Sequence, residues 1–193
     1  MIDQLELKQS RIRPWRLDDA ESLTRHANNR KVWRALRDRF PHPYTAEDAR
    51  KFLEATVKFE PITIFCIEVN DAAVGGIGIH LENDVHRHTA ELGYWLGEEF
   101  WARGVMTEAV GAFTDFCFDR FSLRRIYAEP FANNPASARV LEKAGFIFEG
   151  TPQEQRSQRW GAPRFTALRP DKVAPYEPAT CVSVDHRRYG SPH

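Results

Sequence analysis

The sequence lacks the features that mark several large classes of protein. No apolar run approaches the length that crosses a membrane and no apolar signal segment stands at the N-terminus, so we expect a cytoplasmic protein. The formal net charge is zero, which gives no electrostatic case for binding nucleic acid or a membrane. What remains, 193 residues of which 42% are hydrophobic, is typical of one globular α/β domain.

Metal ligands and paired cysteines are also scarce. The three cysteines are odd in number, widely spaced and without a C-x-x-C pair, so we interpret Cys66 and Cys117 as buried thiols. His80, His86 and His88 lie close together in sequence, but no cysteine or further ordered ligand accompanies them. We therefore expect no metal site, and place these histidines in a hairpin.

The most informative stretch is a strand followed by a glycine-bearing loop and a helix. Residues 91–96 are typical of a short strand, Gly104 lies in the loop, and a helix runs from Val105 to about Phe121. This order places unpaired backbone N–H groups at the positive end of a helix dipole, where a phosphate can bind. The loop lacks the Gly-Lys-Ser/Thr ending of nucleotide triphosphatases and the G-x-G-x-x-G spacing of dinucleotide folds. Taken alone, it also fits an ordinary strand–helix turn.

A second strand-to-helix junction follows about thirty residues downstream. A strand over 125–130 leads to Asn134, which is expected to cap a helix that has Pro135 at its first position. Gly145 is expected to end this helix, directly after its basic last turn. Two such junctions in series strengthen the prediction of a phosphorylated ligand.

These runs resemble the GNAT superfamily of acyl-CoA-dependent N-acetyltransferases, and within it the RimJ/RimL-type branch, which acetylates protein N-termini and small amines. The resemblance covers about Arg11 to Gly150 and includes the N-P-x-S run at 134–137 and the E-K-x-G-F run at 142–146. It implies an α/β (α+β) GNAT fold, in which helices flank a mostly antiparallel sheet with a central splay between two parallel strands. It also implies acetyl-CoA as cosubstrate.

Individual site residues follow from the same resemblance. In the family, the loop before the first long helix holds the coenzyme A pyrophosphate, and an Asn matching Asn134 contacts the pantetheine arm. A Ser matching Ser137 is thought to stabilise or protonate the leaving thiolate. The expected coenzyme contacts are Leu96, Arg103, Gly104, Val105, Met106, Thr107, Glu108, Asn134 and Arg139.

The chemistry of acetyl transfer requires a polarised thioester carbonyl and a neutral amine. In the family, backbone N–H groups at the splay polarise the carbonyl. Because a primary amine is mostly protonated at neutral pH, a base is needed, and Glu91 is our candidate. Glu91 also fits a satisfied structural carboxylate, and Ser137 an accessory capping residue.

Two departures from the family pattern keep an alternative function open. Met106 stands where a small residue is usual beside the phosphates, and Ala102 stands where glycine is frequent. Either substitution could weaken coenzyme binding. An acyl-CoA-binding protein with little or no catalysis is therefore the alternative to an enzyme, and a general phosphate-binding module is a third possibility that the Asn134–Phe146 match disfavours.

A basic segment from Arg25 to Arg39 bears on the acceptor. In a GNAT fold this region covers the acceptor pocket, so its charges could select an acidic acceptor or meet a coenzyme phosphate; a solvated helix face is the alternative. The expected partner is a small-molecule amine or a protein N-terminus, with no nucleic acid or membrane. We expect a monomer or a homodimer.

The chain changes character after Gly150. Six of the twelve prolines lie in the last 43 residues and no alternating strand pattern is sustained, which is typical of a disordered extension. We therefore divide the chain into an acetyltransferase domain, residues 1–150, and an atypical Pro-rich tail, residues 151–193.

A frameshift near Gly150 would explain this change. Family members normally continue with a polar segment, a Lys-Asp-Gly-type turn and a final apolar strand. Permitted codons for Pro152 to Lys172, read one base later, encode LRNSVVKDGALLDSLLYALT, which is that hairpin in order. We hypothesise that the final strand is missing or altered, which would expose a strand edge.

Resequencing of the gene through codons 145 to 175 tests this hypothesis. We expect a one-base insertion or deletion relative to the genes of close relatives. A clean reading frame that those relatives share would contradict it.

Overall fold

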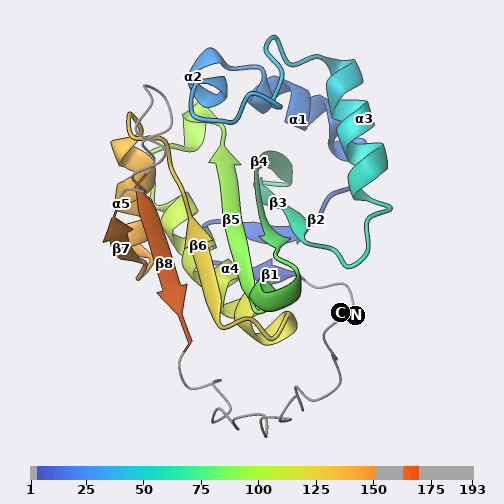
Figure 1. Cartoon of the computed structure of the whole chain (residues 1–193). Helices are drawn as coiled ribbons and strands as arrows, with labels where there is room; N and C mark the ends of the chain where they lie inside the picture. The colour runs from blue at the N-terminus through green and yellow to red at the C-terminus, as the bar shows by residue number, and fades with distance from the viewer. Residues whose placement is uncertain (1–3, 151–162, 170–193) are drawn as a thin grey trace, which may run out of the picture.

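The structure is a computed structural model, which describes residues 4–150 and 163–169. One mixed sheet of eight strands runs through it in the order β1-β2-β3-β4-β5-β6-β8-β7 (Figure 1). The strands are β1 (Leu5–Glu6), β2 (Arg11–Pro14), β3 (Ile64–Val69), β4 (Ala72–Leu81), β5 (Thr89–Leu96), β6 (Arg125–Ala128), β7 (Ile147–Gly150) and β8 (Arg164–Leu168). Every neighbouring pair is antiparallel except β5 with β6, which confirms the predicted fold class.

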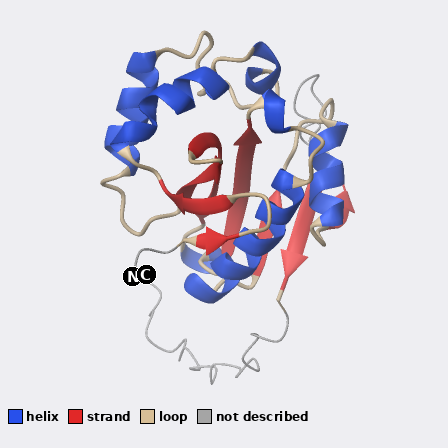
Figure 2. Ribbon diagram, turned by 180° about the vertical axis from the view of Figure 1, so that it is seen from behind, coloured by secondary structure: helices blue, strands red, loops and turns tan. Residues whose placement is uncertain are grey.

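In the described part of the chain, five α-helices flank this sheet. They are α1 (Ala20–Ala27), α2 (Arg30–Trp33), α3 (Ala46–Thr56), α4 (Val105–Arg120) and α5 (Pro135–Lys143). The first three gather at the upper end of the molecule in Figure 1, and α4 lies behind the sheet, as the reverse view in Figure 2 shows. In the described part of the chain, no helix is long and apolar enough to cross a membrane.

Strand alternation sends side chains into two separate cores. In β3, Phe65 and Ile67 pack into the core built with α4, whereas Cys66 between them packs with α1 and α3. The rings of Phe65 and Phe113 meet edge to face at 5.4 Å. Cys66 and Cys117 are buried thiols, as predicted, and burial raises the pKa of both.

The parallel pair β5–β6 opens partway along its length. Pairing runs from Thr89 with Arg125 to Glu91 with Tyr127 and then stops, while β5 continues to Leu96. We call the gap beyond this point the splay. It leaves the last part of β5 hydrogen-bonded to β4 alone among the described strands.

Backbone alternation decides which groups of β5 face the splay. The N–H of Gly97 donates to the carbonyl of Val74 at 2.8 Å, so this residue pair is hydrogen-bonded in the antiparallel ladder. Alternate residues of an antiparallel strand point their backbone groups to opposite sides. The N–H groups of Tyr94 and Leu96, which lie beyond the last pair with β6, therefore point away from β4 and into the splay.

The helix ends predicted from the sequence are confirmed. The side chain of Asn134 accepts from the Ser137 N–H at the start of α5, and Gly145 follows that helix with a φ of +88°. Helix α4 ends at Arg120, one residue before the expected Phe121. Local signals of capping and backbone conformation therefore suffice for these boundaries.

The C-terminal strand differs from expectation. Residues Arg164–Leu168 form β8 and pair with both β6 and β7, so strand pairing does continue after Gly150. Phe165 is buried and its ring centre lies 5.5 Å from that of Phe148 on β7. This apolar contact helps to hold the short strand between β6 and β7. A strand of five residues contributes little to the composition of a 43-residue tail, so the composition did not predict it. The rest of the predicted tail lies outside the described residues, and the frameshift hypothesis stays a prediction.

A buried charge cluster joins β2 to the start of α1. The Arg13 side chain is 3% exposed and donates to both carboxylate oxygens of Asp19, at 2.7 and 2.8 Å. Its Nε donates to Glu68 on β3 at 2.5 Å, and Arg11 donates to the other Glu68 oxygen. Because the buried charges of Arg13, Asp19 and Glu68 are paired with one another, the cluster fixes the α1 end of the molecule to the sheet.

Removal of the Arg13 charge should be costly, since it leaves the buried Asp19 carboxylate without its cation and Glu68 with Arg11 alone. We expect Arg13→Gln to lower the free energy of unfolding by about 3–5 kcal/mol in urea titration. Arg50→Gln is the matched control, because Arg50 lies on the exposed face of α3 and pairs with Glu47 and Glu54 there. Equal stability of Arg13→Gln and the wild type would show that the cluster is not a structural anchor.

Candidate active site

One cleft of about 1850 Å³ connects both strand-to-helix junctions with the sheet face beneath α1 to α3. A pocket for a single small ligand usually measures roughly 300–1000 Å³, so this cleft has room for more than one ligand. Of the residues predicted from the sequence, Glu91, Leu96, Gly104, Met106, Thr107, Asn134, Ser137 and Arg139 line it. Arg103, Val105 and Glu108 belong to the same loop and helix but lie outside the lining.

The first junction presents backbone donors to the cleft. Gly104 precedes α4 with a φ of +85°, a conformation that side-chain-bearing residues rarely adopt. Among the described residues, no side chain caps this helix, so the first N–H groups of α4 keep their hydrogen-bonding capacity for a ligand. Ala102 has a φ of +57°, which explains physically why glycine is favoured at its position.

The side chains of this junction point in different directions. Met106 is 8% exposed and packs into the α4 core, so most of its bulk lies away from the predicted phosphates. The Arg103 guanidinium lies 5.6 Å from the centre of the Phe100 ring. One carboxylate oxygen of Glu108 accepts from the Lys8 N–H at 3.0 Å, and the other is buried without a hydrogen-bond partner in the described structure. Glu108 thus ties the N-terminal segment to α4.

The second junction places a hydroxyl pair beside the splay. The Ser137 and Tyr94 hydroxyl oxygens are 2.7 Å apart, which links the first turn of α5 to β5. Burial raises the pKa of Tyr94 to about 12, so its phenol is neutral and can donate at neutral pH. Tyr94 is a site residue that the sequence did not predict. Tyr94 and Ser137 are 43 positions apart, so the sequence could not predict that their hydroxyls meet. It did place Tyr94 in a strand beside the first junction.

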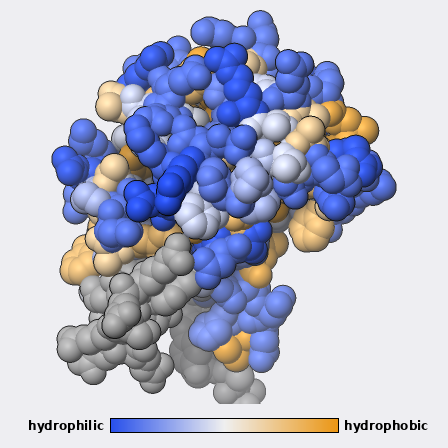
Figure 3. Space-filling view, turned by 90° about the horizontal axis from the view of Figure 1, so that it is seen from above, coloured by the Kyte–Doolittle hydropathy of each residue, from blue (hydrophilic) through white to orange (hydrophobic). Residues whose placement is uncertain are grey.

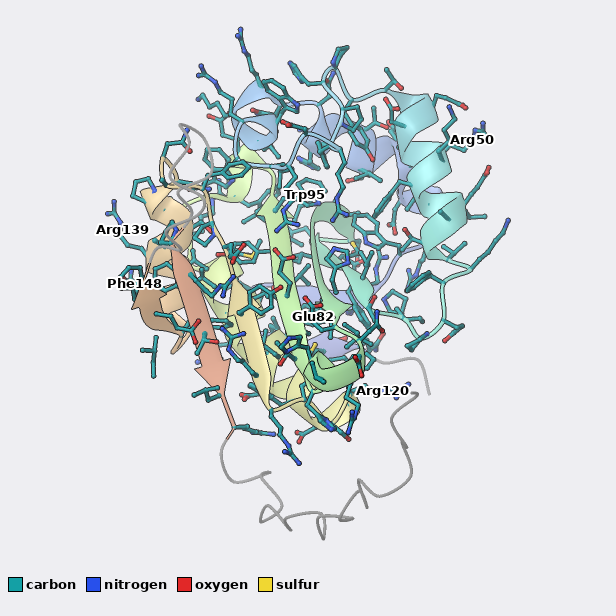
Figure 4. All side chains as sticks on the ribbon, viewed as in Figure 1. Arg50, Glu82, Trp95, Arg120, Arg139 and Phe148 are labelled. Carbon is teal, nitrogen blue, oxygen red and sulfur yellow. The ribbon has the colours of Figure 1, made fainter. Side chains whose placement is uncertain are left out.

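Glu91 lies on the opposite face of β5 from Tyr94. Residues of one strand alternate between faces, so Glu91 and Trp95 face the side of α1 to α3, whereas Tyr94 packs against the α4 core (Figure 4, which labels Trp95). The Glu91 side chain is 16% exposed and is paired with Arg37. The splay therefore has a carboxylate on one face and a hydroxyl pair on the other.

His80 lies beside Glu91, as its cross-strand partner on β4. The Arg39 guanidinium contacts His80 Nε2 at 2.9 Å. Since arginine can only donate, Nε2 accepts, and the ring is neutral with its proton on Nδ1. Partial desolvation, and then the Arg39 charge, lower the pKa of His80, which agrees with this assignment.

The other predicted histidines do not join His80. His88 Nδ1 lies 3.1 Å from the carbonyl oxygen of Ser122, and His86 lies in a short helical turn after β4. Within residues 4–150 and 163–169, no group of three or more His, Cys, Asp or Glu side chains could hold a metal ion.

The basic segment divides into two groups. Arg25 and Lys31 pair with Glu99 and Glu98 at the outer surface, and Figure 3 shows that the molecule is mostly hydrophilic when viewed from that end. Arg37 and Arg39 reach the sheet and line the cleft, which Lys31 also borders. The solvated-face interpretation therefore fits the first group, and the acceptor-pocket interpretation fits the second.

Comparison with known proteins agrees with this geometry. The family described as "Acetyltransferase (GNAT) domain" matches residues 10–147. A Bacillus subtilis protein described as "Probable N-acetyltransferase YjcK" is 34% identical over 147 residues, covering 72% of this chain and 81% of its own length. The ribosomal-protein-serine acetyltransferase of Escherichia coli is 31% identical over 107 residues, covering 54% of this chain and 59% of its own length.

Solved structures share the fold at lower identity. RimL, a ribosomal alpha-N-protein acetyltransferase, in complex with coenzyme A, has a TM-score of 0.74 and is 18% identical, covering 86% of this chain and 98% of its own. The self-immunity acetyltransferase MccE, in complex with acetyl-CoA and AMP, has a TM-score of 0.72 and is 19% identical, covering 84% and 94%.

Two variants test whether the junctions bind coenzyme A. We expect Gly104→Ala to weaken binding at least about tenfold in calorimetric titration, because alanine disfavours a positive φ and the loop must then move. Asn134→Ala should weaken binding as well, since α5 loses its cap beside the cleft.

Gly111→Ala is the matched control for the loop variant. It lies within α4, where an added Cβ meets nothing within 4 Å, so coenzyme affinity should be unchanged. Wild-type affinity in Gly104→Ala would show that the loop conformation does not hold the ligand.

Proposed function

Since this chain belongs to the GNAT family and is an acyl-CoA-dependent N-acetyltransferase, we propose that it transfers acetyl from acetyl-CoA directly to a primary amine, either of a protein N-terminus or of a small molecule. One observation carries the proposal. The splay in β5–β6 opens within a single cleft that has Glu91 on one face and the Tyr94–Ser137 pair on the other. An acceptor and a leaving thiol can thus approach the same carbonyl from opposite sides.

The described residues fit coenzyme A as the donor substrate. The N-terminal amides of α4, preceded by Gly104, suit the pyrophosphate, and the splay suits an extended pantetheine arm. The Tyr94 and Leu96 N–H groups point into the splay, where they can donate to the thioester oxygen as negative charge develops. The Leu96 carbonyl is held by Trp101 Nε1 at 2.7 Å, which stabilises the end of β5.

The groups that transfer protons lie on the two faces of β5. Glu91 takes one proton from the acceptor ammonium, directly or through water, and frees the nitrogen lone pair for attack on the carbonyl carbon. The C–N bond forms, the C–S bond breaks, and the thiolate leaves beside Ser137. The Ser137 hydroxyl, backed by the neutral Tyr94 phenol, protonates the thiolate. The amide nitrogen loses its second proton through water to the Ser137 oxygen, which restores that hydroxyl, and Glu91 releases the first proton to solvent. The products are the amide and the free thiol.

One contact favours the alternative of an acyl-CoA-binding protein without useful catalysis. The candidate base is already paired with Arg37, and a carboxylate held by a guanidinium is a poor proton acceptor unless the pair opens. Turnover decides between the two functions, because both bind coenzyme A and only the enzyme releases free thiol when an amine is present.

Glu91→Gln tests the catalytic assignment, because the amide is nearly isosteric but cannot accept the proton. We expect kcat to fall about 10²- to 10⁴-fold in a thiol-release assay, with coenzyme affinity little changed. Tyr94→Phe should reduce kcat more modestly, since it removes only the partner of the Ser137 hydroxyl. Wild-type kcat in Glu91→Gln would refute its role as the base, and no thiol release by wild-type protein with any amine would support the binding protein instead.

A further inference from the structure

The loop between α2 and α3 lays two guanidinium groups on the acceptor side of the sheet. Arg37 pairs with Glu91 on β5, and Arg39 donates to His80 on β4. Because His80 and Glu91 are cross-strand partners, the two arginines meet the sheet side by side. Both line the same cleft as the proposed base.

The charges at this end of the cleft are unbalanced. Arg37 is neutralised by Glu91, but the partner of Arg39 is a neutral ring, which does not compensate its charge. Of the other two acids that line the cleft, Glu129 is paired with Arg164, and Asp48 keeps its charge at the start of α3, where it accepts from the neutral Thr45 hydroxyl. Arg34 adds further positive charge to the lining, whereas Lys51, which also lines it, pairs with Glu47.

This arrangement disfavours an acceptor that is only a cation. An ammonium that reaches Glu91 must displace Arg37, which would leave a guanidinium without its anion beside a second positive charge. An acceptor with a carboxylate near its amine avoids that cost. Its carboxylate can bind the planar Arg37 donors while its ammonium takes Glu91, so one ion pair becomes two.

We propose that the acceptor is a zwitterion, an amine with a carboxylate a few bonds away, and that Arg37 is the residue that selects it. The inference rests on the proposed acetyltransferase function and extends it to a substrate class. Entry of the zwitterion opens the Arg37–Glu91 pair, so the base becomes free only when the correct acceptor is bound. This also answers how a paired carboxylate serves as a base. Two sources share this chemistry, a free α-amino acid and a peptide whose first residue is Asp or Glu.

The test measures kcat/KM by thiol release for matched acceptors, with one pair for each source. The first pair is alanine and alaninamide, and the second is the C-terminally amidated peptides Asp-Ala-Ala and Asn-Ala-Ala. We expect the carboxylate-bearing member to be favoured at least about tenfold in one of the pairs, in line with a charge-assisted hydrogen bond. The pair that shows the preference identifies the source.

Variants assign the preference to Arg37. In Arg37→Gln the ratio within the responding pair should fall to near one, mainly through a higher KM for the carboxylate member, and Arg37→Lys should retain part of it. Arg50→Gln removes the same charge from the outer side of α3, away from the cleft (Figure 4), and should leave the ratio unchanged. Equal thermal stability and coenzyme affinity of these variants would exclude a merely structural effect.

Several outcomes would overturn the inference. Turnover of both members of each pair with equal kcat/KM would refute the zwitterion while leaving the acetyltransferase in place. Full preference in Arg37→Gln would refute the role of Arg37. Coenzyme binding without thiol release from any acceptor would refute this inference and the proposed function together.

Discussion

The parting of β5 from β6 is the feature on which the site depends. Up to Glu91 and Tyr127 the two strands satisfy each other, and beyond that point the backbone donors of β5 face a gap. Exposed sheet donors are normally a liability, because they invite pairing with another strand. Here they lie within a cleft, so a ligand with a carbonyl can take the place of the missing strand. The chemistry then follows from the strand itself, whose alternation puts Glu91 and Tyr94 on opposite faces.

Such a gap persists only if both sides are held by something other than each other. On the β6 side, β8 pairs along the whole of that strand and Phe165 packs beside it, so β6 keeps a ladder partner where β5 has left it. On the β5 side, β4 pairs to the end of the strand and Trp101 holds the terminal carbonyl. The C-terminal strand thus supports the site without entering it.

The charged side chains around the cleft form two groups, one that anchors the fold and one that we propose recognises the acceptor. The Arg13 cluster is buried and mutually satisfied, so its charges fix the position of α1 and hence of the loop that follows α2. Arg37 and Arg39 are exposed, so each can exchange its present partner for an incoming anion. The buried Arg13 cluster is therefore fixed, whereas the exposed Arg37 and Arg39 can change partners. An ion pair that opens when the substrate binds requires both properties.

The amino-acid sequence by itself determined the features that depend on neighbours in the chain. Gly104 before α4, the Asn134 cap with Pro135 after it, and the end of α5 at Gly145 are set by the conformational preferences of a few adjacent residues. These signals were sufficient to locate both junctions. Together with the family resemblance they predicted the fold class, and eight of the eleven predicted site residues line the cleft.

Only the tertiary structure decided which distant side chains meet. The contacts of Arg37 with Glu91 and of Tyr94 with Ser137 span 54 and 43 positions. The placement of β8 depends on the edge of β6 that faces away from β5. Hydrophobic periodicity specifies the face of a strand but neither its neighbour nor the residue at which pairing stops. Those choices belong to the packing of the whole sheet, because each strand position is stable only when the others are filled.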